Sequence, residues 1–331
     1  MYRRLILAAT LAITALLMLG GVTAQAAPGS LRILFVTNQG DGDFTEFLPV
    51  LRATPGVATV DTFDSSADTP SAASVASYDL IVSTGDSSYG DQALYGDRLA
   101  DYIDAGGAVI QFAYDNWEAT LAHPTGRFES GGYPPFIPGD NDNLLTFLGQ
   151  VLVSNSPLLA GVSSFTTQDN VTDTLAPGAT LLALWADGRN AIATKGRVVS
   201  VTASPEDGGD FAPISAAARL VVNAGNVLGR HTLTVKKTGP GSGTVTSAPA
   251  GIKCGKTCKA TFAGDTAITL TAKPKKSSFI GWKGVVGCKK SSRCTFTPTA
   301  NTTVKAKFGC KKKKAKGSAQ SAKQKKCKKK R

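Results

Sequence analysis

Few residues in the first 230 positions have the type and spacing that catalysis requires. The candidates follow two short apolar segments and are Asp86, Ser87, Asp115 and Glu118. Two carboxyl groups can act as general acid and base when one of them is held protonated. A serine can act as nucleophile when a base lies within hydrogen-bond reach. The alternative role of Ser87 is structural, because Ser and Asp residues before a helix accept hydrogen bonds from its free N–H groups.

The elements that must position these candidates follow a strand–helix–strand pattern. Residues 78–84 and 108–114 are apolar segments of strand length, and residues 91–105 carry apolar side chains at helical spacing. Gly106 and Gly107 indicate the end of the helix, because glycine adopts the left-handed cap conformation without a Cβ clash. A crossover of this length predicts a pair of parallel strands.

The same alternation extends over the first 230 residues. Strands are expected at 31–37, 57–63, 180–185, 191–194 and 197–203, helices at 44–52 and 214–228, a short helix or turn at 144–148 and a long irregular loop over 115–143. This pattern predicts an α/β fold, a flavodoxin-like doubly wound parallel sheet with helices on both faces.

Loops at the carboxyl ends of parallel strands bind ligands in such folds. The ligand-facing residues expected there are Asn38, Asp41, Tyr89, Asn116, Trp117 and His123. Three segments rich in Asp, Asn and Gly, at 41–43, 140–143 and 207–210, offer oxygens that suit Ca²⁺. None completes a calcium-binding loop and such segments are typical of turns, so we expect no metal and no cofactor.

Four stretches of this region resemble the class I glutamine amidotransferase-like superfamily: LRILFVTN, SYDLIVSTG, LADYIDAGGAVIQF and APGATLLALWADGRNAIATKGRVVSVT. The resemblance covers residues 31–230 and implies the same α/β fold. In active members, a Cys nucleophile follows the strand that matches 108–114, and a His acts as base. Here Tyr114, Asp115, Asn116 and Trp117 occupy that turn, no Cys precedes Cys254, and the candidate His is His123. We therefore expect the superfamily's hydrolase chemistry to be lost.

Residues 231–309 have a different composition, with short segments rich in Thr and Val separated by Gly, Pro and Lys, which predicts a small all-β module. Six Cys residues occur late in the chain, at Cys254, Cys258, Cys288, Cys294, Cys310 and Cys327. Local disulfides within the first two pairs are the simplest connectivity; a zinc site is the alternative. The last two Cys residues could pair with each other or with another chain.

The stretch from LTVKKTGPGSGTVTSAPAGIKC to FIGWKGVVGC, with the closing TTVKAKF, resembles the divergent InlB B-repeats of exported bacterial proteins. The resemblance implies a β-grasp-like or sandwich-like spacer or adhesive unit without catalysis. Trp282 is expected in its core, with ligand stacking as the alternative.

Both ends of the chain carry their own signals. Residues 1–27 have the features of a cleaved secretory signal, namely Arg3 and Arg4, an apolar run and a small-residue cleavage site; an uncleaved membrane anchor is the alternative. Residues 310–331 form a Lys-rich tail that is expected to be disordered. Its polyanion-binding candidates are Lys311, Lys312, Lys313, Lys314, Lys328, Lys329 and Lys330.

The net charge of +13 combines an acidic and a basic region. Residues 28–230 hold nine basic and 23 acidic residues, whereas residues 231–310 hold 14 basic residues and the single acid Asp265. Such a distribution favours attachment to an anionic cell-envelope polymer or another polyanion. Without aromatic residues among the tail lysines, specific nucleic-acid recognition is not expected. The tail could instead lie on the acidic domain, or remain solvated.

These features predict four regions: signal peptide 1–27, amidotransferase-like domain 28–230, β-repeat domain 231–309 and basic tail 310–331. The predicted function is non-catalytic binding by an exported, envelope-associated protein that the tail anchors, with no membrane span after signal cleavage. The alternative is a secreted hydrolase that acts on a glycan or amide through carboxylate groups, Asp86 with Asp115 or Glu118. The sequence carries no signal for an oligomeric state.

Overall fold

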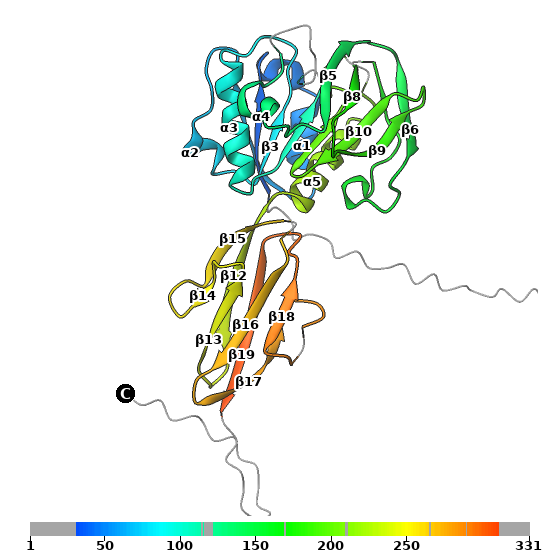
Figure 1. Ribbon diagram of the computed structural model, residues 1–331. Helices are drawn as coiled ribbons and strands as arrows, with labels where there is room; N and C mark the ends of the chain where they lie inside the picture. Colours follow the sequence, from blue (N-terminus) through cyan, green and yellow to red (C-terminus); the bar gives the residue numbers. More distant parts are fainter. Residues whose placement is uncertain are drawn as a thin grey trace, which may run out of the picture.

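The computed structural model describes residues 31–113, 115, 122–168, 170–208, 211–264, 266–288 and 290–310. The predicted signal segment, residues 311–331 of the Lys-rich tail, and the loop residues Asn116, Trp117 and Glu118 lie outside the described residues. We refer to residues 31–230 as the α/β part and to residues 231–310 as the β module (Figure 1).

The α/β part is built on one nine-stranded sheet with the order β2-β1-β3-β4-β11-β10-β9-β6-β7. Its strands are β1 Leu31–Thr37, β2 Val57–Asp64, β3 Leu80–Ser83, β4 Val109–Phe112, β6 Thr146–Val151, β7 Thr166–Thr167, β9 Thr180–Trp185, β10 Asn190–Lys195 and β11 Val198–Val201. A separate antiparallel pair joins β5 Phe136–Asn141 to β8 Val171–Leu175. The helices are α1 Phe47–Ala53, α2 Ala72–Val75, α3 Gln92–Asp104, α4 Gly126–Ser130 and α5 Ser215–Val227, with single 3-10 turns at Asp41–Phe44 and Pro157–Leu159.

Helices cover both faces of the parallel strands, as the sequence predicts for a doubly wound sheet. One apolar core joins α1 and α5 to one face of the central strands. A second core joins α3 to the other face through Tyr95, Leu99 and Tyr102. The strands β1, β3 and β4 are buried on both faces, which explains why their sequences are continuous apolar runs rather than alternating ones.

The sheet differs from the prediction in being mixed rather than parallel. Strands β2, β1, β3, β4 and β11 run parallel to one another. Strand β10 pairs antiparallel with β11, and β9, β6 and β7 continue the sheet in further antiparallel pairs. The expected helix or turn at 144–148 is wrong, because residues Thr146–Val151 form strand β6 beside β9. The expected irregular loop over 115–143 contains α4 and β5.

The β module is a sandwich of two four-stranded sheets, with the orders β15-β12-β19-β17 and β14-β13-β16-β18. Its strands are β12 Arg230–Thr238, β13 Gly243–Ala248, β14 Lys253–Cys254, β15 Lys259–Ala263, β16 Ile268–Pro274, β17 Ser277–Lys283, β18 Arg293–Phe296 and β19 Thr302–Cys310. Alternating apolar residues of both sheets form one core, which includes Trp282 and Phe308. Trp282 is therefore a core residue, as expected.

Disulfides cross-link residues that lie close in sequence in this small sandwich. Cys254 pairs with Cys258 and Cys288 pairs with Cys294, which is the local pairing that the spacing predicts. Cys310 is also disulfide-bonded. The β module is near the size at which an apolar core alone gives marginal stability, so each cross-link matters. In the described residues of both parts, no helix is long and apolar enough to cross a membrane.

Candidate functional site

The most unusual side chain of the α/β part is Asp115, which follows β4. Only 1% of its surface is exposed. The hydroxyl of Tyr89 donates a hydrogen bond of 2.6 Å to its Oδ1 atom. Its Oδ2 atom is buried and has no hydrogen-bond partner among the described residues. A buried carboxyl oxygen without a partner carries a desolvation cost, and it marks this position as a candidate functional site.

Two parallel neighbours in the sheet bring Tyr89 to Asp115. Strand β3 pairs with β4, so the segments that follow these strands meet at the same edge of the sheet. Tyr89 stacks on Tyr95 of α3 with ring centroids 4.9 Å apart. The Tyr95 hydroxyl in turn lies 2.8 Å from the Ser83 Oγ atom, at the end of β3. The phenol that binds Asp115 therefore stacks on a tyrosine that is itself hydrogen-bonded to β3.

Burial raises the pKa of the Asp115 carboxyl to about 7, although the nearby polar groups of Ser83, Tyr89 and Gln111 act in the opposite direction. The cause is the loss of hydration that the charged form would need. At neutral pH this carboxyl is therefore present in both its protonated and its ionised form. That property suits a group that donates or accepts a proton, or that binds a ligand in either state.

Asp115 lines a pocket of about 170 Å³. Its polar lining residues are Gln111, Asp115, His123, Glu129 and Lys195, and its apolar walls come mainly from Phe, Pro and Ala side chains. An apolar pocket with a few convergent polar groups is the usual form of a small-molecule site.

Helices α3 and α4 position two further polar residues of the pocket, His123 and Glu129. The Gln92 side chain of α3 donates a hydrogen bond of 2.9 Å to the carbonyl of His123. Helix α4 starts after Thr125 and carries Glu129. The Nε2 atom of His123 lies 4.0 Å from Glu129 Oε1. The pocket thus combines a buried carboxyl, an imidazole and a second, half-exposed carboxyl.

Asp86, the predicted partner of Asp115, is not among the residues that line the Asp115 pocket. Asp86 is exposed, and partial desolvation followed by repulsion from Asp43 raises its pKa. The carboxyl that shares a pocket with Asp115 is Glu129. Glu118, the other predicted partner, lies outside the described residues.

The remaining predicted residues have structural contacts. Asn38 is buried and binds the main chain of Ser87 in both directions, with its Nδ2 atom donating to the Ser87 carbonyl and its Oδ1 atom accepting from the Ser87 N–H. The cap of α3 is Asp91, which accepts a hydrogen bond from Leu94 N–H, so the cap expected from Ser87 is wrong. Asp41 lies in the first 3-10 turn.

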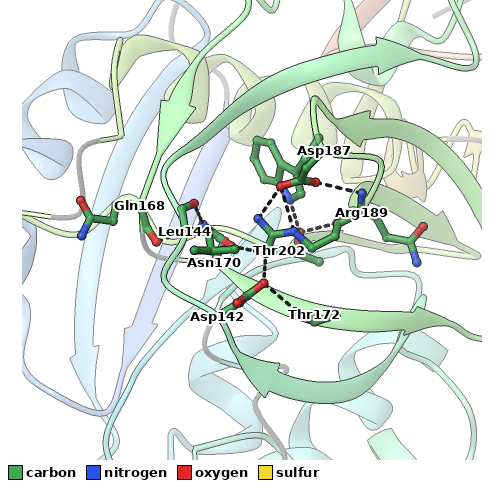
Figure 2. Close-up of polar contacts among 10 residues, drawn as sticks. Asp142, Leu144, Gln168, Asn170, Thr172, Asp187, Arg189 and Thr202 are labelled. Atoms are coloured by element: carbon green, nitrogen blue, oxygen red, sulfur yellow. Dashed lines mark hydrogen bonds and ion pairs between the residues drawn. The ribbon is translucent and has the colours of Figure 1, made fainter.

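In two of the three acidic turns considered for calcium, at 140–143 and 207–210, an Asp carboxylate binds protein donors. Figure 2 shows Arg189 beside Asp142 of the 140–143 turn: its guanidinium binds Asp142 at 2.8 Å, and it also binds Asp187, which lies outside these turns, at 2.7 Å. It also donates to the Oδ1 atom of Asn170 at 2.6 Å. The hydrogen bonds from Arg189 lower the pKa of Asp187. Asp207 accepts hydrogen bonds from the main chain of Thr45 and Glu46, at the start of α1.

Within the described ranges, no group of three or more His, Cys, Asp or Glu side chains could hold a metal ion.

Three pocket residues were not predicted from the sequence: Gln111, Glu129 and Lys195. Gln111 is the single polar residue inside the apolar run of β4, and that exception was a usable signal. Glu129 and Lys195 lie on elements whose positions depend on the antiparallel extension of the sheet and on α4. No local pattern points to them.

One comparison with known proteins identifies the β module, and the others give no match or low similarity. Residues 231–312 match the Divergent InlB B-repeat domain, which confirms that resemblance. No curated protein matches the chain.

Solved structures with a similar fold include a cytoplasmic protein from Salmonella typhimurium, at 14% identity with a TM-score of 0.49 over 60% of this chain and 99% of that chain. They also include a putative ThuA-like protein from Bacteroides uniformis, at 14% identity and TM-score 0.47 over 62% and 94%. A glutamine amidotransferase from Thermotoga maritima aligns at 11% identity and TM-score 0.37 over 53% and 76%.

Proposed function

We propose that this chain is an exported binding protein that its basic C-terminal region holds on an anionic cell-envelope polymer, while the α/β part presents the Asp115 pocket to a small ligand. The observation that carries the proposal is the separation of charge. The ion pairs formed between described residues lie in the α/β part: between Arg32 and Asp79, between His123 and Glu129, and around Arg127 and Arg189. The β module contains 14 basic residues and a single acidic residue.

Uncompensated cations attract polyanions because binding releases condensed counterions into solution. The two disulfides support a location outside the cytoplasm, since such bonds persist in oxidising compartments. The match to a bacterial repeat domain supports the same location.

The test is binding to cell-envelope fractions at several salt concentrations. The variant replaces seven tail lysines, Lys311 to Lys314 and Lys328 to Lys330, by Gln in the full chain, so that every Cys remains. Its control replaces the same lysines by Arg, which preserves the charge. If about seven contacts are lost, the slope of log K against log salt should fall by about five. Equal binding by the Gln variant and the unmodified chain would reject anchoring by the tail.

A second candidate function is hydrolysis, favoured by one specific observation: a buried carboxyl with a pKa of about 7 shares a pocket with Glu129 and His123. A protonated Asp115 could give its proton to a leaving group, and Glu129 or His123 could activate water. Incubation of the full chain with small amide and glycoside substrates tests this candidate. Turnover that the Asp115→Asn variant abolishes would support it. Absence of turnover with ligand binding retained would leave the pocket as a binding site.

A further inference from the structure

The outer face of the sheet β15-β12-β19-β17 carries lysines on neighbouring strands in matching register. Lys236 of β12 pairs with Lys305 of β19, and Lys305 pairs with Lys283 of β17. Residues paired in this way project from the same face of a sheet, with strands about 4.8 Å apart. The three side chains are exposed, and their neighbours Val235, Val304 and Trp282 point into the core. We call Lys236, Lys305 and Lys283 the lysine row.

Two further lysines extend this face along the strands. Lys307 is two residues beyond Lys305 on β19, and it is exposed while Ala306 between them is buried. Lys259 of β15 is exposed and pairs with Thr234, which is two residues before Lys236. The face therefore presents a field of lysines across four strands rather than one isolated cation.

No acid compensates this field among the described residues of the β module, and its lysines take part in none of the ion pairs between residues that the structure describes. Like charges directly opposite one another on adjacent strands destabilise a sheet. A bound chain of anionic groups removes that repulsion and gains the entropy of the released counterions. The face is thus complementary to a linear polyanion.

The residue type narrows the class of ligand. The cations of the row and its extension are all lysines, whereas Arg230, at the start of β12, lies over the ring of Tyr102 in the α/β part. Lysine acts on phosphate as a mobile point charge, whereas arginine supplies the rigid fork used for bidentate recognition. Such a surface suits a flexible polymer of repeated phosphate groups.

An open hollow of about 530 Å³ adjoins the row, and Lys283, Lys290 and Lys307 line it together with Ile280 and Val285. Its apolar floor can accept the uncharged part of a polymer unit beside a bound phosphate.

We infer that the lysine row is a built binding site for a linear phosphate polymer, formed by the folded β module. The inference deepens the proposed function and rests on it, because it assigns part of the polyanion attachment to one face of the folded β module and names the class of polymer. The row would give the protein a second, structurally fixed contact with the same class of polymer, so that tail and module bind together with a raised effective concentration.

The test uses long-chain linear polyphosphate as the probe and the full chain with the seven tail lysines replaced by Gln as the starting protein. In this background, the row variant carries K236Q, K283Q and K305Q. The matched control carries K253Q, K256Q and K273Q, which removes the same charge from exposed positions on and beside the other sheet.

The row variant should bind polyphosphate about 100-fold more weakly at 0.1 M salt, because three contacts at a slope of about 0.7 each are lost. The control should lose less than about fivefold, since it changes only the general field. A row of K236R, K283R and K305R should retain binding, which shows that charge rather than lysine packing is needed. Thermal melts verify that each variant folds.

Equal losses in the row variant and the matched control would overturn the inference, because the face would then act only through net charge. Binding to vesicles of neutral lipid with one-quarter phosphatidylglycerol as tight as to polyphosphate would also overturn it, in favour of a membrane surface. Neither result bears on the tail, whose role is decided by comparing the unmodified chain with the tail variant.

Discussion

The buried carboxyl of Asp115 makes a quantitative prediction for the Asp115→Asn variant. The ordinary carboxyl pKa of 3.8 applies to the unfolded chain, and the folded protein raises the pKa of Asp115 to about 7. The folded state therefore binds the proton more tightly than the unfolded state. Its contribution to stability is fully present below pH 3.8 and decreases as the pH rises toward 7.

The magnitude follows from the two pKa values. Each pH unit between them removes about 1.4 kcal/mol of stability, which gives about 4 kcal/mol in all. From pH 5 to pH 8, the loss is about 3 kcal/mol. Asn has a similar shape and no ionised form, so the variant lacks this loss. The unfolding free energy of D115N minus that of the unmodified chain should be about 3 kcal/mol more positive at pH 8 than at pH 5.

The assay is calorimetric unfolding of both proteins at pH 5 and pH 8. For a part of this size, 3 kcal/mol corresponds to a relative Tm shift of about 6–12 °C. The transition of the β module serves as an internal reference. The exposed Asp68→Asn variant corrects for the loss of one surface charge. If the difference between D115N and the unmodified chain is the same at both pH values, Asp115 does not carry a raised pKa and the reasoning is refuted.

Three further predictions concern the polar contacts of the α/β part. Tyr89→Phe removes the hydrogen bond to Asp115 Oδ1, so stability at pH 8 should fall by about 1–3 kcal/mol in urea unfolding. The double variant of Tyr89→Phe with Asp115→Ala, which leaves no acceptor for the Tyr89 hydroxyl, should lose less than the sum of the two single changes, by at least about 0.5 kcal/mol, and additive effects would exclude a direct contact. Arg189→Ala leaves the exposed Asp142 and Asp187 without their shared cation, so it should cost about 1–2 kcal/mol by urea unfolding, whereas a change below 0.5 kcal/mol would show that the network does not stabilise the fold.

The elements with a strong local signal were predictable from the sequence. The continuous apolar runs of β1, β3 and β4 identify buried parallel strands, and the helical spacing before Gly106 identifies α3. The strands of the β module follow from alternation and from Gly and Pro between them. In each case the sequence within ten residues determines the outcome.

The edge of the large sheet was less predictable, for a physical reason. The apolar residues of 144–148 fit a helical turn and a strand equally well at such a length. Pairing with β9 decides in favour of a strand, and that pairing joins residues more than 30 positions apart. The direction of the added strands likewise depends on long-range contacts, which no local period reports.

The candidate site shows the same limit. Asp115 was visible as a polar residue after a buried strand, but its burial was not. Burial depends on Tyr89, which the sequence placed in a loop open to ligand and which the structure packs onto Tyr95. The pocket partner Glu129 depends on α4, inside a segment predicted to be irregular. Residue type could therefore nominate Asp115, but only tertiary packing gives it an unusual pKa.

Both candidate functions of the pocket, ligand binding and hydrolysis, depend on the protonation state of Asp115. They differ in the pH dependence that they predict. Below about pH 7 its unpartnered Oδ2 oxygen can carry a proton and donate to a ligand acceptor; above that pH it can only accept. A binding site would then show an affinity that changes monotonically through pH 7 and persists in D115N for ligands that need a neutral partner. A hydrolytic site that uses Asp115 as acid and Glu129 or His123 as base would show a rate that rises and then falls around neutral pH, and D115N would abolish it. Ligand affinity and hydrolysis rate, each measured against pH in the unmodified chain and in D115N, therefore decide between binding and catalysis. Binding needs the Asp115 proton to stay in place or to be absent, whereas catalysis needs Asp115 to give its proton away.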